Sequence, residues 1–179
     1  MEKRKSAMFR AFSRKSKFSF LNIAALGAFI VLLILNNYLT NDPISDVEGR
    51  AKVIDGDSLV VNGREVRLQG IDAPEGRQMC RRNNREWACG RESRNVLRRL
   101  IGGKSVSCEA LDIDKHDRLL ALCRVGGVEL NREMVALGFA LSYGRFRNEE
   151  RAAKASRRGM WAGEFERPRD WRRQRNIGR

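Results

Sequence analysis

The sequence predicts an α+β domain over residues 49–179 that follows a hydrophobic N-terminal segment. Short segments rich in β-branched residues flank Asn62-Gly63, which is a strong signal for a two-residue hairpin turn. An amphipathic segment that ends at Gly102-Gly103 carries apolar residues at helical spacing. A continuous apolar run from Ile23 to Leu35 stands apart from both. These observations indicate strands and helices together in one domain of ordinary size.

Five segments of the domain are expected to form strands. In the third of them Val66 and Leu68 share one face, and Arg67 points to the other, because side chains alternate along a strand. Two later segments, joined by a turn over residues 114–118, read as an antiparallel pair. The five predicted strands are Lys52–Ile54, Ser58–Val61, Arg64–Gly70, Ser105–Leu111 and Leu119–Val125.

Three segments are expected to form helices. The first runs from Arg85 to Ile101 and is ended by the two glycines. The second begins at an N-cap residue, Asn131, and ends at Leu137. The third, Glu149–Arg158, follows Asn148 as its N-cap. The basic tail from Arg167 to Arg179 is expected to fray.

The N-terminal segment has the pattern of a membrane anchor. Residues 1–17 carry seven basic side chains and one acid, and an uncharged stretch with thirteen consecutive apolar residues follows. Because roughly 20 such residues cross a bilayer core, we expect a transmembrane helix or signal anchor over residues 18–39, then a polar linker over residues 40–48. Asn36–Thr40 offers no small-x-small cleavage site, which favours a retained anchor over a cleaved signal and secreted form.

The distribution of charge predicts the orientation and the partner. The basic residues 1–17 should stay in the cytoplasm, so that a single pass of the inner, cytoplasmic membrane would place the domain in the periplasm or outside the cell. Residues 49–179 hold 29 Lys and Arg against 18 Asp and Glu, a net charge of +11. This excess predicts a polyanionic partner, either nucleic acid or anionic lipid headgroups. Nothing in the sequence indicates a protein partner.

Four cysteines lie in the part of the chain that is expected to face outward. An even number of cysteines in an oxidising compartment favours disulfides, and three connectivities exist. We favour Cys80–Cys89, which closes a short loop, and Cys108–Cys123, which joins two strands that look paired. A zinc site is the rival interpretation, but the chain has no CxxC and a single histidine.

A short stretch of the chain gathers four carboxylates and an arginine, and a second arginine follows in Asp114-Lys115-His116-Asp117-Arg118. Carboxylates beside guanidinium groups suit metal-assisted hydrolysis of a phosphodiester. The single motifs have plainer interpretations, such as a polar turn for Asp55-Gly56-Asp57 or a surface salt bridge for either arginine. Taken together they indicate a nuclease. The residues are Asp55, Asp57, Arg67, Asp72, Glu75 and Arg118.

These residues and spacings resemble the staphylococcal nuclease-like (thermonuclease) family over roughly Arg50 to Trp171. The segments Leu130–Gly138 and Arg158–Gly163 follow in the order of the family, and the ordered series is more specific than any single motif. The resemblance implies a family domain over residues 49–172 with a basic tail over residues 173–179. It also implies a five-stranded OB-type Greek-key β-barrel with three helices.

The resemblance assigns roles to the site residues. Asp57 and Asp72 match the metal-binding carboxylates, with the backbone carbonyl of Ala73 as a third ligand, and Asp55 would orient the loop. Such hard oxygen ligands select Ca²⁺, which the family uses, in preference to Mg²⁺. The proposed general base of the family corresponds to Glu75. The two arginines that grip the scissile phosphate correspond to Arg67 and Arg118.

The resemblance therefore implies a Ca²⁺-dependent endonuclease that hydrolyses DNA and RNA, preferentially single-stranded, with little sequence specificity. A non-catalytic OB-fold module that binds nucleic acid at the membrane surface is the alternative. A structural domain that uses only its charge on lipid or cell wall is a third interpretation. The turn departs from the family pattern, since His116-Asp117 stands where Tyr-Gly is usual. Asp117 could therefore pair with the neighbouring Arg118, and His116 is expected to be an exposed turn residue.

Overall fold

The computed structural model describes residues 20–40 and 44–176, and the chain divides into two compact units, Met1–Pro43 and Ile44–Arg179. In the first unit, helix α1 spans Phe20–Thr40, and its apolar side chains from Ile23 to Leu35 are exposed. Among the described residues no helix combines the length and the apolar character needed to cross a membrane. The helix is thus confirmed, while the membrane span over residues 18–39 stays a prediction. The basic segment 1–17 lies outside the described residues.

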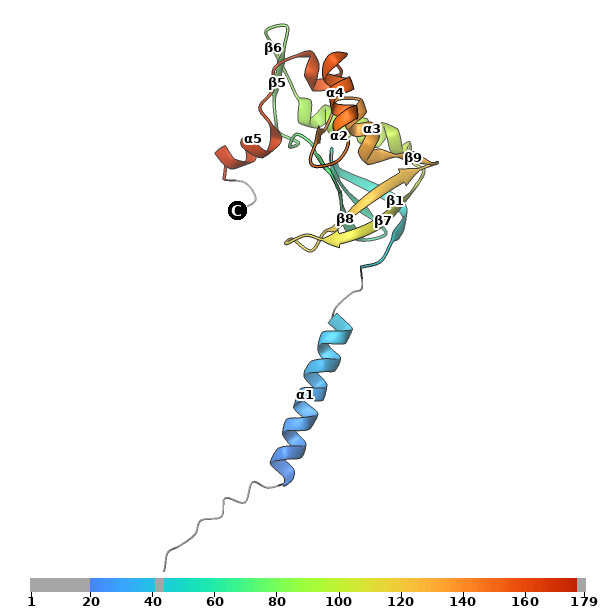
Figure 1. The fold of residues 1–179 in the computed structure, drawn as a ribbon, viewed down its shortest axis with the longest axis vertical. Coiled ribbons are helices and arrows are strands. Elements are labelled where there is room, and N and C mark those ends of the chain that lie inside the picture. The colour runs from blue at the N-terminus through green and yellow to red at the C-terminus, as the bar shows by residue number, and fades with distance from the viewer. Residues whose placement is uncertain (1–19, 41–43, 177–179) are drawn as a thin grey trace, which may run out of the picture. The chain divides into compact units, whose positions relative to one another are not determined.

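The second unit is built on a closed mixed β-barrel of five strands, as predicted (Figure 1). Neighbouring strands pair antiparallel in the order β3-β2-β1-β7-β8. Strands β3 and β8 then pair in parallel and close the barrel. A short strand, β9 (Val128–Glu129), extends the sheet beyond β8. The five barrel strands are β1 (Val47–Asp55), β2 (Ser58–Val61), β3 (Arg64–Leu68), β7 (Ser105–Ile113) and β8 (Leu119–Val125).

Alternation along the strands sorts side chains between the barrel interior and its surface. In β3 the side chains of Val66 and Leu68 are buried, whereas Arg67 between them is only half-buried, as the sequence parity predicts. Burial of apolar side chains on one face of each strand is the main stabilising term of such a barrel. The fully buried strand residues are Leu59, Val61, Val66, Leu68, Val106, Cys108, Leu119, Ala121 and Cys123.

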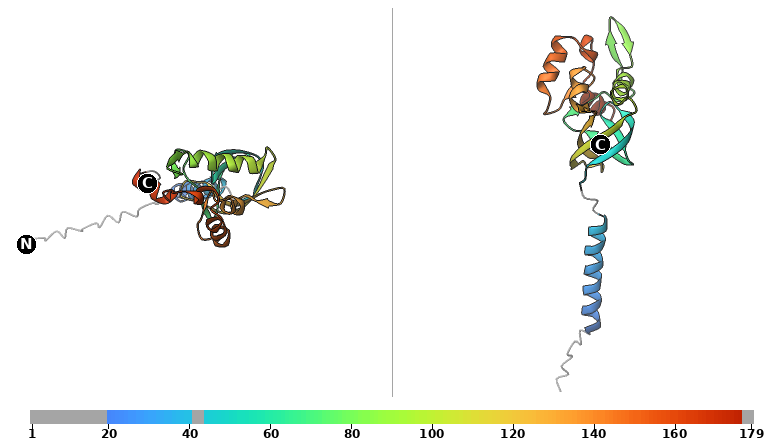
Figure 2. Two further views of the ribbon diagram at one scale, coloured as in Figure 1. Left: turned by 90° about the horizontal axis from the view of Figure 1, so that it is seen from above. Right: turned by 90° about the vertical axis from the view of Figure 1, so that its right-hand side faces the viewer.

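The first predicted helix is shorter than expected, because its N-terminal part is a strand. Helix α2 spans Cys89–Ile101 and ends at Gly102, which has a left-handed backbone with φ 58°. Ahead of it, β6 (Arg85–Trp87) pairs antiparallel with β5 (Cys80–Arg82). Asn83 and Asn84 form the intervening turn with φ of 51° and 56°, a conformation that asparagine tolerates better than most residues. The resulting hairpin stands out from the rest of the unit (Figure 2).

The two other predicted helices exist, but their N-caps differ from those expected. Helix α3 spans Leu130–Ala136 with Glu129 at the N-cap position. Asn131 lies inside the helix, where its fully buried amide donates to backbone carbonyls of Gln69 and Ala121 and accepts from the N–H of Cys123. The prediction of Asn131 as the N-cap is wrong: its side chain bonds neighbouring strand and loop backbone instead of capping the helix.

Helix α4 spans Arg147–Ala155, so that it begins one residue before the predicted cap Asn148 and ends before Arg158. Phe146 occupies the N-cap position in a left-handed conformation with φ 62°. The chain then continues through a 3₁₀ turn, η1 (Gly159–Ala162).

The C-terminal segment is ordered where fraying was expected. Helix α5 spans Pro168–Gln174 and starts with proline, whose fixed φ suits the first turn. Pro168 and Trp171 are buried, and this apolar contact holds the helix against the domain. Residues 177–179 lie outside the described residues. A second small sheet pairs β4 (Ile71–Asp72) with β10 (Leu141–Ser142).

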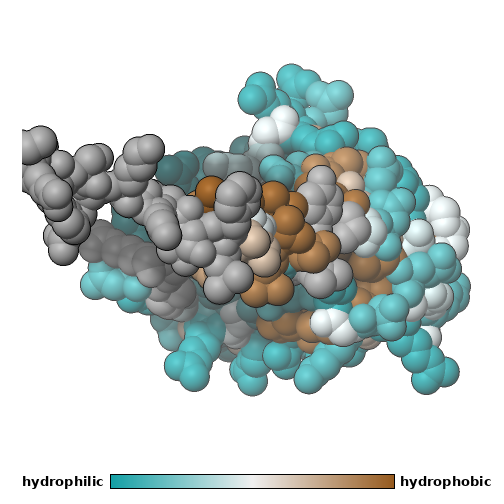
Figure 3. Space-filling model, turned by 90° about the horizontal axis from the view of Figure 1, so that it is seen from below, coloured by the Kyte–Doolittle hydropathy of each residue, from teal (hydrophilic) through white to brown (hydrophobic). Residues whose placement is uncertain are grey.

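The two predicted disulfides are confirmed. Cys80–Cys89 ties the β5–β6 hairpin to the start of α2, with a Cα–Cα distance of 5.6 Å. Cys108–Cys123 joins residues that face each other directly across β7 and β8. The described part of the chain has no free cysteine. Much of the surface visible in Figure 3 is hydrophilic, in keeping with the many charged residues of the chain.

Candidate functional site

A cavity of about 1150 Å³ lies beside the seam where β3 and β8 close the barrel. Four of the residues predicted for the site line it: Arg67, Asp72, Glu75 and Arg118. The rest of the wall is mixed, with apolar residues of the strands, two further carboxylates (Glu65 and Asp114), several basic side chains and the exposed ring of Tyr143. The residues with polar or aromatic side chains that line it besides these four include Lys115, His116, Tyr143, Arg145, Arg169 and Arg172.

The parallel pairing of β3 and β8 places the two predicted arginines on one side of the barrel. Its register aligns Val66 with Leu119, so Arg67 and Arg118 each lie one residue from that aligned pair. Arg67 is on the face of β3 that points away from the core, and Arg118 directly precedes β8. The register of one strand pair thus brings together residues that are 51 positions apart in the sequence.

Asp57 does not itself line the cavity but contacts Arg67, which does, and it is 6% exposed. One of its carboxylate oxygens, Oδ1, accepts a hydrogen bond from Ser58 Oγ at 3.0 Å. The other, Oδ2, accepts from the backbone N–H of Ala73 at 3.2 Å and from Arg67 Nη2 at 3.3 Å. The Ala73 contact joins the Asp57 turn to the loop that carries Glu75.

Two further carboxylates of the cluster have raised pKa values. Burial raises the pKa of Asp72, and the neighbouring charge of Asp57 adds to the shift although Arg172 and Arg67 oppose it. Burial, followed by the charges of Glu75 and Asp57, raises the pKa of Asp55 to about 6. Burial is the main cause of both shifts, because it disfavours the charged form of a carboxyl group.

Arg118 is paired with Asp114 rather than with Asp117. Its Nε and Nη2 donate to Asp114 Oδ2 at 2.9 and 2.6 Å. Asp114 Oδ1 accepts from the backbone N–H groups of His116 and Arg118 at 2.9 and 3.1 Å, which closes the turn. Burial alone would raise the pKa of Asp114, but the hydrogen bonds from Arg118 and His116 outweigh it and lower the pKa. His116 is exposed, as expected.

One residue of the site, Arg172, is not part of the motifs in the sequence that predict the others. Arg172 of α5 reaches into the cavity, where Nη1 donates to Glu75 Oε1 and Nη2 to Asp72 Oδ1, both at 2.9 Å. Burial alone would lower the pKa of Arg172, but these two carboxylates outweigh it and raise the pKa. Seven arginines lie between Arg157 and Arg175, and nothing in their order distinguishes Arg172. Only the docking of α5 selects it.

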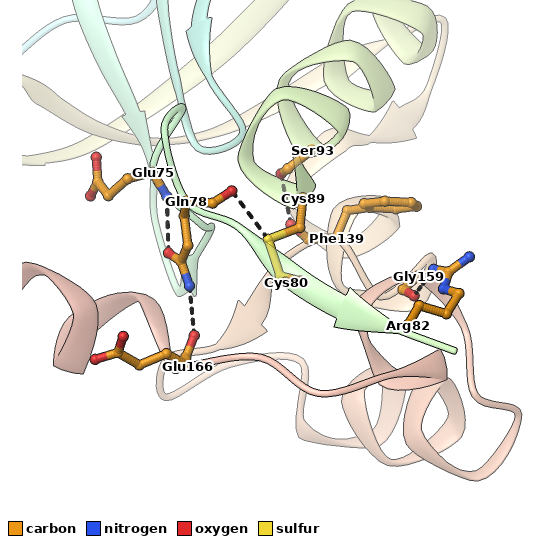
Figure 4. The surroundings of a disulfide bond; sticks show 9 residues. All are labelled: Glu75, Gln78, Cys80, Arg82, Cys89, Ser93, Phe139, Gly159 and Glu166. Atoms are coloured by element: carbon orange, nitrogen blue, oxygen red, sulfur yellow. Dashed lines mark hydrogen bonds between the residues drawn. A yellow bond between two sulfur atoms is a disulfide. The ribbon is translucent and has the colours of Figure 1, made fainter. Parts of the chain in front are cut away.

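A buried glutamine supports the loop that carries Glu75 (Figure 4). Gln78 is fully buried, and its Oε1 accepts from the backbone N–H of Glu75 at 3.3 Å. Its Nε2 donates to the carbonyl of Glu166 at 2.6 Å, just before α5. Gly90 in the first turn of α2 lies so close to the Glu75 carbonyl that a side chain there would collide with it. The loop is therefore held by α2, by the segment before α5 and by Gln78.

The donor atoms suit a hard divalent cation in part. Asp57 and Asp72 approach the same guanidinium of Arg67, at 3.3 and 3.8 Å, so both carboxylates face a common space. Oxygen ligands without histidine or thiolate are those that Ca²⁺ and Mg²⁺ prefer. Within the described residues no three acidic, histidine or cysteine side chains converge as a complete metal site. Backbone oxygens and water would have to complete the coordination of a metal held here.

The chain is similar to known proteins over the region that builds this cavity. Residues 65–163 match the staphylococcal nuclease homologue family. A "probable staphylococcal-like nuclease" of Oryza sativa subsp. japonica is 38% identical over 129 residues, 68% of this chain and 32% of the relative. An "uncharacterized endonuclease" of Haemophilus influenzae is 32% identical over 138 residues, 70% of this chain and 72% of the relative.

A third relative carries a name of a different kind. The succinoglycan biosynthesis protein ExoI of Rhizobium meliloti is 28% identical over 151 residues, 79% of this chain and 77% of the relative. The chain spans about a third of the length of the rice relative. Since the family match covers more than half of the chain and includes both arginines of the barrel seam, Asp72 and Glu75, the protein belongs to the staphylococcal nuclease homologue family.

Proposed function

We propose that this protein is a nuclease that hydrolyses phosphodiester bonds of DNA and RNA. The observation that carries the proposal is the cavity in which two arginines and two carboxylates converge from separate segments. Family relatives named as nucleases and endonucleases support the same reaction class.

Glu75 is proposed as the general base. Its carboxylate lines the cavity, and its backbone is fixed by Gln78. A carboxylate held in this way can orient a water molecule and accept its proton during in-line attack on phosphorus. Proton transfer to a positioned group typically contributes 10²–10⁴-fold to a rate, as an order of magnitude.

Arg67 and Arg118 are proposed to bind the scissile phosphate. Negative charge gathers on the non-bridging oxygens as water attacks, and a planar guanidinium can donate two hydrogen bonds to them. Arg118 is oriented by Asp114, and Arg67 by Asp57. Both guanidinium groups are therefore directed before substrate arrives, which is the condition for electrostatic stabilisation of a transition state.

A Ca²⁺ ion is the cofactor that we propose, in preference to Mg²⁺. Asp57 and Asp72 would hold it, with the carbonyl of Ala73, and Asp55 would orient the turn from behind. A bound divalent cation supplies charge neutralisation of the phosphate. Support for this assignment comes from the oxygen-only donor set and from the approach of Asp57 and Asp72 to the same guanidinium group of Arg67.

Single-stranded nucleic acid of any sequence is the proposed substrate. The cavity wall includes the basic side chains of Lys115, Arg145 and Arg169 beyond the two central arginines, which suits a phosphate backbone. Tyr143 at its edge is 65% exposed and can stack on an unpaired base.

The proposed location is outside the cytoplasm. Two disulfides in one small domain are supporting evidence, because cytosolic thiols are kept reduced. We also propose attachment to the inner membrane through residues 18–39, because the sequence has a long apolar run after a basic segment. Cell fractionation tests it: recovery of the protein in the soluble cytosolic fraction with free thiols would contradict the proposed location.

The alternative is a module that binds nucleic acid without cutting it. The net charge of +11 over residues 49–179 is the observation that favours it, since charge suffices for binding. One experiment separates the two functions. The full-length chain is incubated with single-stranded DNA and RNA in the presence of Ca²⁺ or of a chelator, with Glu75→Gln as the matched variant. Ca²⁺-dependent fragments from the wild-type chain alone are expected; binding without fragments would establish the module.

A further inference from the structure

The carboxylate cluster of the site already contains a cation that belongs to the protein. Arg172 donates from Nη2 to Asp72 and from Nη1 to Glu75, both at 2.9 Å. All three side chains are mostly buried, with exposures of 22% for Arg172, 13% for Asp72 and 27% for Glu75. A pairing that is largely shielded from solvent and uses two donors of one guanidinium is stronger than a solvent-exposed salt bridge.

The helix that carries Arg172 is anchored on both sides of this contact. Trp171 is buried beside it, and Pro168 is buried at the start of the helix. Glu166, just before the helix, is tied by its carbonyl to Gln78, and Gln78 also binds the backbone of Glu75. The guanidinium is thus positioned by the fold, and its contact with the carboxylates is not a chance meeting of mobile surface chains.

The proposed divalent metal and Arg172 share one carboxylate. Asp72 is one of the two carboxylates proposed to hold Ca²⁺, and its Oδ1 is occupied by Arg172. Two cations in contact with one carboxylate repel each other, and the repulsion is stronger in a partly buried site than in water because the effective dielectric constant is lower. Metal and guanidinium therefore oppose each other at Asp72.

We propose that Arg172 is a positioning residue that binds Glu75 and competes with the divalent metal for Asp72, and so lowers the metal affinity of the site. In the metal-free protein it holds the two carboxylates in place and prevents their mutual repulsion from opening the cavity. When metal binds, Arg172 gives up Asp72. The coupling between two binding events is reciprocal. Bound metal must therefore weaken the docking of α5 by the same free energy as docked α5 weakens metal binding. This inference rests on the proposed function, because it assumes a metal at Asp57 and Asp72.

The experiment measures Ca²⁺ binding to the full-length chain by titration calorimetry, without any substrate. Arg172→Gln removes the competing charge and should tighten Ca²⁺ binding by about ten-fold or more. Arg172→Lys keeps the charge and should stay near the wild-type affinity. Arg173→Gln is the control for the loss of one positive charge on the same helix, since Arg173 is 71% exposed and pairs with Asp170; it should change Ca²⁺ affinity little.

A purely structural role of Arg172 predicts the opposite sign, because damage to the site weakens metal binding. Unchanged or weaker Ca²⁺ binding by a folded Arg172→Gln chain would overturn the proposal. If that variant does not fold, amide hydrogen exchange of α5 in the wild-type chain is measured instead. Ca²⁺ should accelerate the exchange of residues Pro168 to Gln174. Unchanged or slower exchange would overturn the proposal. If the wild-type chain binds Ca²⁺ and cuts DNA but Arg172→Gln binds Ca²⁺ no more tightly, this inference alone is refuted. If the wild-type chain binds no Ca²⁺, the proposed metal is refuted as well.

Discussion

The side chain of Gln78 holds the backbone of Glu75. Its Oε1 accepts the Glu75 N–H at 3.3 Å from a fully buried position, while the Gln78 N–H donates to the Glu75 carbonyl at 2.7 Å. The direction of the proposed general base therefore depends on a residue that never reaches the cavity.

Gln78→Ala should lower the cutting rate by about ten-fold or more while substrate affinity stays near the wild-type value. A buried hydrogen-bond partner is lost at a cost of roughly 1–3 kcal/mol, and the Glu75 backbone is freed. Ser93→Ala is the control, since it removes another fully buried polar side chain, which bonds the carbonyl of Phe139. Equal losses of cutting in the two variants would contradict a specific role of Gln78.

Glu75→Gln should cut DNA at a rate lower by roughly 10²–10⁴-fold and bind it normally, because the amide keeps the shape but cannot accept the proton. Rates and binding are measured on a labelled single strand, by gel analysis and fluorescence anisotropy. A variant that cuts at the wild-type rate would remove Glu75 from the proposed role.

Arg67→Lys and Arg118→Lys should each reduce cutting by roughly 10²–10³-fold, because an ammonium keeps the charge but loses the two-donor fork. Arg99→Lys is the matched control. Arg99 lies on α2, is 64% exposed and pairs with Glu92 away from the cavity. The effect is measured as the single-turnover cutting rate. If the variants lost only substrate affinity and kept this rate, the arginines would act by charge attraction alone.

The two disulfides should contribute similarly to stability and differently to catalysis. Each closes a short loop, with sequence separations of 9 and 15, and removal of either should cost about 3 kcal/mol of unfolding free energy by loop entropy. The double Cys→Ala variant at Cys80 and Cys89 should also slow cutting, because this bond adjoins Gln78 and the Glu75 loop (Figure 4). The pair at Cys108 and Cys123 serves as the control for stability. If both variants cut at the same rate at temperatures below their unfolding transitions, the proposed effect of the Cys80–Cys89 bond on catalysis would be refuted.

Stability should fall in acid through the Asp114–Arg118 pair. The folded pKa of Asp114 lies below its unfolded value, so the pair stabilises the fold above the unfolded value of about 3.8 and loses its effect as the pH falls through the folded value. Asp114→Asn should therefore lower the midpoint of thermal unfolding at pH 7, and the difference from wild type should shrink towards pH 3. A difference independent of pH would exclude this ion pair as its source.

The strands could be predicted from the sequence because β-branched residues flank the turn at Asn62-Gly63, whereas the closed barrel was implied only by the resemblance to the staphylococcal nuclease-like family. Strand β6 lies within the segment that the sequence predicts as a helix, since Arg85-Glu86-Trp87 has no alternation that favours a strand. The pairing of β6 with β5 depends on a two-asparagine turn and a disulfide. The motif also indicated the carboxylates and arginines of the cavity. Arg172 could not be found in this way, because its role arises from the docking of α5 and not from a pattern in the chain.

The seam between β3 and β8 also sets where this protein can change length during evolution. Turns such as those at Asn62-Gly63 and Gly126-Gly127 lie outside the β3–β8 register and can accept insertions without moving a guanidinium. A single residue gained or lost within β3 would turn Arg67 into the barrel and Val66 outward. Homologues should therefore vary in their hairpins while these two strand segments keep a constant number of residues.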